Sequence, residues 1–82
     1  MYNIFLLPQA QKDLDNLKGK TFQQIRDKII LLRENPRPPG CLKLTAEEGY
    51  RLRSGNYRII YRISDKERKV FIYRIKHKKD AY

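Results

Sequence analysis

The chain has one cysteine, one histidine and no tryptophan. One cysteine excludes an intramolecular disulfide, so we expect Cys41 to be a small, partly buried side chain in a protein of a reducing compartment. One cysteine and one histidine cannot form a zinc site, and we expect neither a metal nor another cofactor. No apolar run reaches the ~20 residues that span a bilayer, and the N-terminus does not resemble a secretory signal. We therefore expect a cytoplasmic protein that does not act at a membrane.

Acidic residues are scarce relative to basic ones. Nineteen Lys and Arg against nine Asp and Glu give a formal net charge of +10 over 82 residues. Most of the excess lies in the second half of the chain. Such a field favours a polyanionic partner, above all a nucleic acid or an acidic protein. The length suits one small domain, which we place at residues 1–82.

The first half of the sequence predicts one strand and two helices. An apolar, partly β-branched segment at 2–7 indicates a strand, and Pro8 is suited to open the helix that follows. Apolar residues at helical spacing predict that helix over 9–17. A wider apolar stripe predicts a second helix, from an N-cap at Thr21 to about Glu34.

The second half predicts strands. A proline-rich segment at 35–40 can be neither helix nor central strand, so we expect a turn there. Period-two alternation then predicts a strand that begins at 42–44, is interrupted by a turn or bulge, and continues at 50–53, followed by strands at 57–63 and 69–75. The order βααβββ indicates an α+β fold, a single compact domain with a helical hairpin packed on an antiparallel sheet.

Arginine alternates with apolar residues in these strands. Arg51 and Arg53 share one face of their strand, with Leu52 on the other, and Arg58 shares a face with Ile60. A solvated strand face is the simpler interpretation of the first pair, whereas a solvated charge is less expected at Arg58. Fixed guanidinium groups without a carboxylate cluster suit metal-independent RNA cleavage, in which the ribose 2′-hydroxyl attacks the adjacent phosphorus.

The run from Tyr50 to Tyr61, followed by His77-Lys-Lys-Asp-Ala-Tyr82, resembles the RelE branch of the RelE/ParE toxin superfamily. The upstream strand and helices match in order, so the resemblance covers essentially the whole chain. It implies a RelE-like fold and the toxin of a type II toxin–antitoxin pair. RelE-type toxins enter the ribosomal A site and cleave mRNA there by the 2′-hydroxyl route, which inhibits translation.

The resemblance also implies roles for individual residues. The paired arginines of strand 50–53 match positions that contact the substrate, and Arg58 matches the arginine that stabilises the charged phosphate. The C-terminal tyrosine matches one that stacks on the base or assists proton transfer, and a further basic position falls on His77 or Lys78. Because arginine hardly deprotonates, His77 or the tyrosine would accept the proton, unless arginine lowers the barrier through electrostatics alone. The expected catalytic residues are Arg51, Arg53, Arg58, His77 and Tyr82. The residues expected to bind RNA phosphates are Lys43, Arg62, Arg74, Lys76, Lys78 and Lys79.

The expected partners are an acidic antitoxin, the RNA of the small ribosomal subunit, and mRNA. A strongly cationic face is readily masked by an acidic segment that folds on binding. Two other functions stay open from the sequence. One is a ParE-like inhibitor of DNA gyrase without nuclease activity, and the other is a basic binding module that has lost catalysis.

Overall fold

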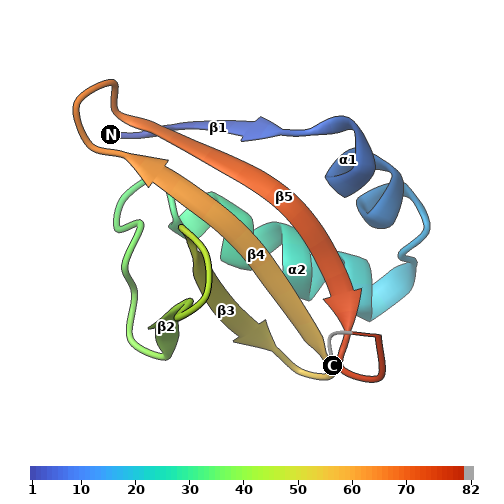
Figure 1. The fold of residues 1–82 in the computed structure, drawn as a ribbon. Helices are drawn as coiled ribbons and strands as arrows, with labels where there is room; N and C mark the ends of the chain where they lie inside the picture. The colour runs from blue at the N-terminus through green and yellow to red at the C-terminus, as the bar shows by residue number, and fades with distance from the viewer. Residues whose placement is uncertain (81–82) are drawn as a thin grey trace.

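The computed structural model describes residues 1–80 of the chain, in which two helices and five strands form (Figure 1). In chain order these are β1 (Asn3–Leu6), α1 (Pro8–Asp15), α2 (Gly19–Leu31), β2 (Cys41–Lys43), β3 (Tyr50–Ser54), β4 (Tyr57–Ser64) and β5 (Lys69–His77). The helices come before a run of consecutive strands, which confirms the predicted α+β fold.

The five strands form one sheet in the order β1–β5–β4–β3–β2. β1 runs parallel to β5, and every other neighbouring pair is antiparallel. The predicted antiparallel sheet is therefore correct except at this edge. Figure 1 shows β4 and β5 as long neighbouring strands across the middle of the molecule, with α2 behind them and α1 beside β5.

The segment 42–53, predicted as one interrupted strand, forms two strands. β2 and β3 are antiparallel neighbours, so the chain reverses between them. Gly49 permits this reversal, because its φ of 134° is in a region that L side chains rarely adopt, and a Cβ there would lie 2.9 Å from the Tyr61 carbonyl oxygen. The Leu44 N–H donates to the Gly49 carbonyl at 3.0 Å and closes the turn.

The helices begin and end close to their predicted limits. α1 starts at Pro8, which occupies the first helical position as expected. α2 starts at Gly19, ahead of the predicted N-cap Thr21, because Gly19 adopts a φ of 59° and reverses the chain straight into the helix. It ends at Leu31 instead of Glu34, since its last turn tightens into i→i+3 hydrogen bonds before the proline-rich loop.

The core lies between the helices and one face of the sheet. α1 packs against β5 and β1, and α2 packs against β3. The buried apolar side chains come from both helices and from the three central strands: Ala10, Ile25, Ile29, Leu32, Leu52, Ile59, Tyr61, Val70, Ile72 and Ile75. No helix within residues 1–80 is long and apolar enough to cross a bilayer.

A β-bulge in β5 changes which residues face the core. Ile60 pairs with Arg74 and Tyr61 with Ile72, so Tyr73 is an extra residue in β5. The buried positions of this strand consequently shift from Val70 and Ile72 to Ile75. A bulge re-aims the side chains that follow it, and here it places Arg74 on the face opposite the core.

A polar cluster ties together the N-terminal segment, the α2–β2 loop and the β4–β5 turn. Arg37 donates two hydrogen bonds to the Asp65 carboxylate and one to the Tyr50 hydroxyl, and the Tyr2 hydroxyl also donates to Asp65. The hydrogen bonds from Arg37 and Tyr2 lower the pKa of Asp65 to about 2. This cluster stabilises the end of the molecule that lies away from Arg58.

Candidate active site

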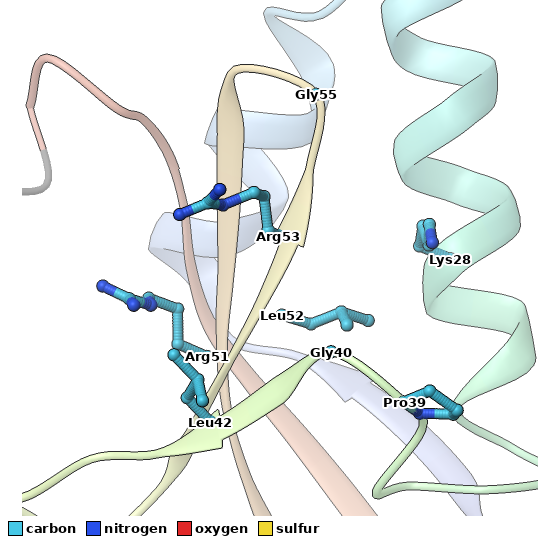
Figure 2. A pocket seen from close by; sticks show the side chains of 8 residues that line it. All are labelled: Lys28, Pro39, Gly40, Leu42, Arg51, Leu52, Arg53 and Gly55. Atoms are coloured by element: carbon cyan, nitrogen blue, oxygen red, sulfur yellow. The ribbon is translucent and has the colours of Figure 1, made fainter.

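One face of the sheet is rich in basic side chains. The five strands contain no Asp or Glu, and seven of their eight Lys and Arg residues lie on this face: Arg51, Arg53, Arg58, Arg62, Lys69, Arg74 and Lys76. Figure 2 shows Arg51 and Arg53 on the side of β3 that points away from α2, while Leu52 points toward the helix. We call the face opposite the helices the open face.

Three cations lie side by side across the open face. Arg53 on β3 is directly opposite Arg58 on β4, and Arg58 is directly opposite Lys76 on β5. Within residues 1–80 none of the three forms an ion pair with a carboxylate. Like charges directly opposite each other destabilise a sheet. This arrangement, called here the cation row, is therefore suited to an anion that is supplied by a ligand.

Arg58 is the central member of the row and is almost fully buried. Its relative exposure is 6%. Its Nη1 donates to the Tyr57 carbonyl oxygen at 3.3 Å, and its Nε has no hydrogen-bond partner among the residues described. Leaving a buried donor unsatisfied costs about 1–3 kcal/mol. A phosphate oxygen that contacted this guanidinium would gain a fixed, charge-assisted hydrogen bond.

A second row lies beside the first, and a carboxylate from α1 pairs with one of its cations. Arg51, half-buried, is opposite Ile60, which is opposite Arg74. Arg74 Nε lies 2.8 Å from an oxygen of Asp13 on α1, and the same carboxylate accepts the Ile75 N–H at 2.9 Å. Burial acts to raise the pKa of Asp13, but these hydrogen bonds outweigh it and the pKa is lowered. Arg74 thus already has a carboxylate partner, whereas the members of the cation row have none within residues 1–80.

His77 is not a member of the cation row, although it lines a small pocket at the edge of β5 together with Lys76. It lies opposite Tyr57 at the end of β5, and the two rings meet edge to face with centroids 5.1 Å apart. Strand alternation places this pair on the face opposite Arg58. The His77 Nδ1 accepts the Lys79 N–H at 3.2 Å, so in the neutral ring Nε2 carries the proton. The other expected proton acceptor, Tyr82, lies outside the described residues.

The residues expected to bind RNA phosphates fall in different places. Arg62 and Lys76 lie on the open face, and Lys76 completes the cation row. Lys43 is opposite Tyr50 and so lies on the other face, at the sheet edge. Lys78 and Lys79 are exposed in the turn after β5. The position of Lys76 depends on the bulge. The one sign of the bulge in the sequence of β5 is that the spacing of the apolar residues changes from two to three.

A groove of about 450 Å³ lies between α2 and the edge formed by β3 and β2 (Figure 2). Lys28, Pro39, Leu42 and Leu52 are among the residues that line it. Arg51 and Arg53 also line it, whereas Arg58 does not. The groove is therefore a partly apolar surface that meets the cation row at Arg53.

Comparison with known proteins identifies the family. Residues 4–82 match the family model of the ParE toxin of the type II toxin–antitoxin system parDE. The chain belongs to this toxin family, within the RelE/ParE superfamily. No curated protein matches the sequence. The family resemblance stated from the residues is thereby confirmed, and the protein is the toxin of a type II toxin–antitoxin system.

Solved structures of RelE proteins share the fold. The chain is 26% identical to a chain of the RelBE2 toxin–antitoxin complex from Mycobacterium tuberculosis, with a TM-score of 0.82 and coverage of 93% of this chain and 96% of that one. It is 26% identical to a chain of the archaeal RelE–RelB complex from Pyrococcus horikoshii, with a TM-score of 0.81 and coverage of 98% of each. The isolated RelE toxin of E. coli has a TM-score of 0.81 at 22% identity, over 94% of this chain and 84% of that one, and supports the fold alone.

Proposed function

We propose that this toxin is a ribosome-dependent endoribonuclease that cleaves mRNA in the A site and so inhibits translation. The observation that carries the proposal is the cation row, with Arg58 buried at its centre and its Nε unpartnered within residues 1–80. A gyrase inhibitor or a structural strand face has no need of three adjacent cations that no carboxylate of residues 1–80 pairs with. A site that stabilises extra charge on a phosphate does.

The reaction divides among these residues as follows. The 2′-hydroxyl attacks the adjacent phosphorus in line, the bond to the 5′-oxygen breaks, and a 2′,3′-cyclic phosphate and a 5′-hydroxyl form. Arg58 stabilises the charge that develops on the non-bridging oxygens, because a fixed guanidinium needs no reorganisation. Arg53 and Arg51 hold the flanking phosphates. No metal is needed for these steps.

Proton transfer requires further groups. Lys76 is the side chain directly opposite Arg58 on β5, and its ammonium offers three N–H donors to the leaving 5′-oxygen. We assign to Lys76 the protonation of that oxygen, and to Tyr82, acting as its phenolate, the acceptance of the 2′-hydroxyl proton. His77 acts in this scheme only by fixing the end of β5 through its contacts with Tyr57 and Lys79.

The direct test is cleavage of mRNA on programmed ribosomes by the purified, antitoxin-free toxin. We expect cuts within the A-site codon that leave cyclic phosphate and 5′-hydroxyl ends, and loss of cleavage in Arg58→Ala. His77→Ala serves as the matched control on the other face and should retain most of the activity. Intact mRNA with the folded wild-type toxin would refute the proposal.

Inhibition of DNA gyrase is the second candidate function, because the family model that matches this chain describes the ParE toxin. It predicts inhibition of gyrase supercoiling by the purified toxin while translation on programmed ribosomes continues. Cleaved mRNA together with unaffected supercoiling would exclude it.

The proposed protein partner is an acidic antitoxin whose extended segment covers the cation row. The row and its neighbours form a cationic face without strand carboxylates, which is complementary to such a segment. The solved complexes of similar chains from Mycobacterium tuberculosis and Pyrococcus horikoshii contain RelB antitoxins. An acidic peptide that covers the row should release RNA from the toxin, with a competition that weakens as salt rises.

A further inference from the structure

The open face carries a second feature, at the end away from the cation row. Phe5 on β1 and Phe71 on β5 are directly paired, and their rings stack with centroids 5.6 Å apart at 23°. Arg62 lies over Phe71 at 5.3 Å and over Tyr73 at 5.8 Å, and Lys69 lies over Phe5 at 5.6 Å. We call these five side chains the aromatic patch.

The aromatic patch has no role in the core. Phe5 is 41% exposed, on an edge strand. Its neighbours in β1, Ile4 and Leu6, pack toward the core, so the ring points to the open face. Burial therefore gives no reason for a phenylalanine at this position. Aromatic rings interleaved with Arg and Lys on a sheet surface are the feature with which proteins bind unpaired nucleobases.

The patch and the cation row lie on one continuous surface. Arg62 and Arg58 share a face of β4 four residues apart, which corresponds to about 13 Å along the strand. A single-stranded RNA with a phosphate at Arg58 would thus bring a neighbouring nucleotide, not the one being cut, to the patch. Arg62 and Lys69, which lie over the rings, are complementary in charge to the phosphates of the same RNA.

We propose that the aromatic patch is a stacking platform for an unpaired base of the single-stranded RNA whose phosphates lie on the cation row. This inference rests on the proposed function for the identity of the ligand, and it adds a base-binding subsite built from Phe5, Phe71 and the Arg62 guanidinium plane. Stacking on such a platform tolerates any base, because every base has a π-face. The platform therefore strengthens binding without setting codon preference.

The absence of tryptophan from the chain provides a clean probe. Phe5→Trp places the only indole of the chain in the patch, and Phe22→Trp places it on α2 instead, where Arg26 also lies over the ring, at 5.9 Å. The ligands are oligoadenylate RNA with 2′-O-methyl groups, which cannot be cleaved by the 2′-hydroxyl route, and inorganic polyphosphate, which has no bases. Oligoadenylate should quench the indole fluorescence of the Phe5→Trp variant and leave that of the Phe22→Trp variant unchanged. Polyphosphate should quench neither variant.

Affinities give the second measurement. Phe5→Leu and Phe71→Leu keep an apolar side chain but remove the ring, and each should weaken oligoadenylate binding about fivefold or more while polyphosphate binding is unchanged. Phe5→Leu at the exposed edge keeps the test valid if the Phe71 variant fails to fold. Unchanged oligoadenylate affinity, or equal quenching by both ligands, would overturn the platform. A third ligand, polyglutamate, represents an acidic protein: if the Leu variants weakened its binding and left oligoadenylate binding unchanged, the platform would also be overturned and the patch would be assigned to an acidic protein.

The platform and the proposed nuclease can fail separately. If wild-type toxin cleaves A-site mRNA but the Leu variants bind oligoadenylate normally, the platform alone is refuted. If oligoadenylate quenches the Phe5→Trp variant and the Leu variants lose affinity while wild-type toxin leaves mRNA intact, the platform is supported and the nuclease is refuted.

Discussion

Replacing Arg58 should stabilise the protein, and this is the sharpest consequence of the cation row. Arg58→Met keeps an unbranched apolar stem of similar length and removes the charge. It also removes the buried Nε, which lacks a partner among residues 1–80 at a cost of about 1–3 kcal/mol. It further removes like-charge contacts with Arg53 and Lys76, each worth about 0.2–1 kcal/mol. The substitution also loses the hydrogen bond from Nη1 to the Tyr57 carbonyl oxygen, which contributes about 0.5–1.5 kcal/mol. We therefore expect a net gain of about 1 kcal/mol, or about 4–8 °C in Tm for a domain of this size.

The same substitution should abolish the proposed activity. Removing one fixed donor that stabilises transition-state charge lowers rates by about 10²–10³. Arg58→Met should therefore be the more stable and the less active protein. The measurements are thermal unfolding by circular dichroism and cleavage of mRNA on programmed ribosomes. Melting in low and high salt separates the two stabilising effects, because added salt screens the like-charge repulsion but leaves the unsatisfied Nε unchanged.

Arg62→Met is the matched control, on the same strand and the same face. Its guanidinium lies over two rings, and cation–π contacts at exposed sites contribute about 0.5–1 kcal/mol. This variant should melt at or below the wild-type temperature. The reasoning fails if Arg58→Met melts below wild type, or if it still cleaves mRNA at the wild-type rate.

Three further predictions concern the parts of the fold that hold the site. Gly49→Ala should lose more than about 1 kcal/mol of unfolding free energy, because its Cβ would lie 2.9 Å from a carbonyl oxygen. Gly40→Ala, with a φ of 92° and open space around the Cβ, carries backbone strain alone, and urea unfolding compares the two variants. Tyr61→Phe should lose about 1 kcal/mol in the same assay, because its buried hydroxyl donates to a loop carbonyl at 2.8 Å. Asp65, whose pKa the hydrogen bond from Arg37 lowers to about 2, contributes stability above pH ~4 that disappears as the pH falls toward 2, so Asp65→Asn should make acid unfolding shallower.

The sequence predicts most of the fold because its local signals agree with the tertiary structure. Strand alternation correctly places Ile59 and Tyr61 toward the helices and Arg58 away from them. Two of the errors occur where a glycine decides the path of the chain. Gly19 starts α2 ahead of the expected cap, and Gly49 folds the expected single strand into β2 and β3.

The site is predicted less completely, because one β-bulge reverses the faces of the sheet on which Lys76 and His77 lie. Alternation without the extra Tyr73 would place Lys76 with Val70 and Ile72 on the core face. With it, Lys76 faces the ligand side and His77 the helices. A bulge depends on the pairing of two strands, which local periodicity does not report. His77, the residue expected to transfer a proton, thus lies on the other side of the sheet from Arg58.

The cation row also links stability to binding. A polyanion that binds only the folded toxin stabilises it by an amount that grows with ligand concentration, and at this site it also relieves the repulsion among Arg53, Arg58 and Lys76. In the proposed function, RNA and the acidic antitoxin would both meet this requirement and would therefore compete for the same cations. It follows that inorganic polyphosphate should raise the Tm of the wild type more than that of Arg58→Met, since the variant has already lost most of the charge repulsion that the ligand relieves.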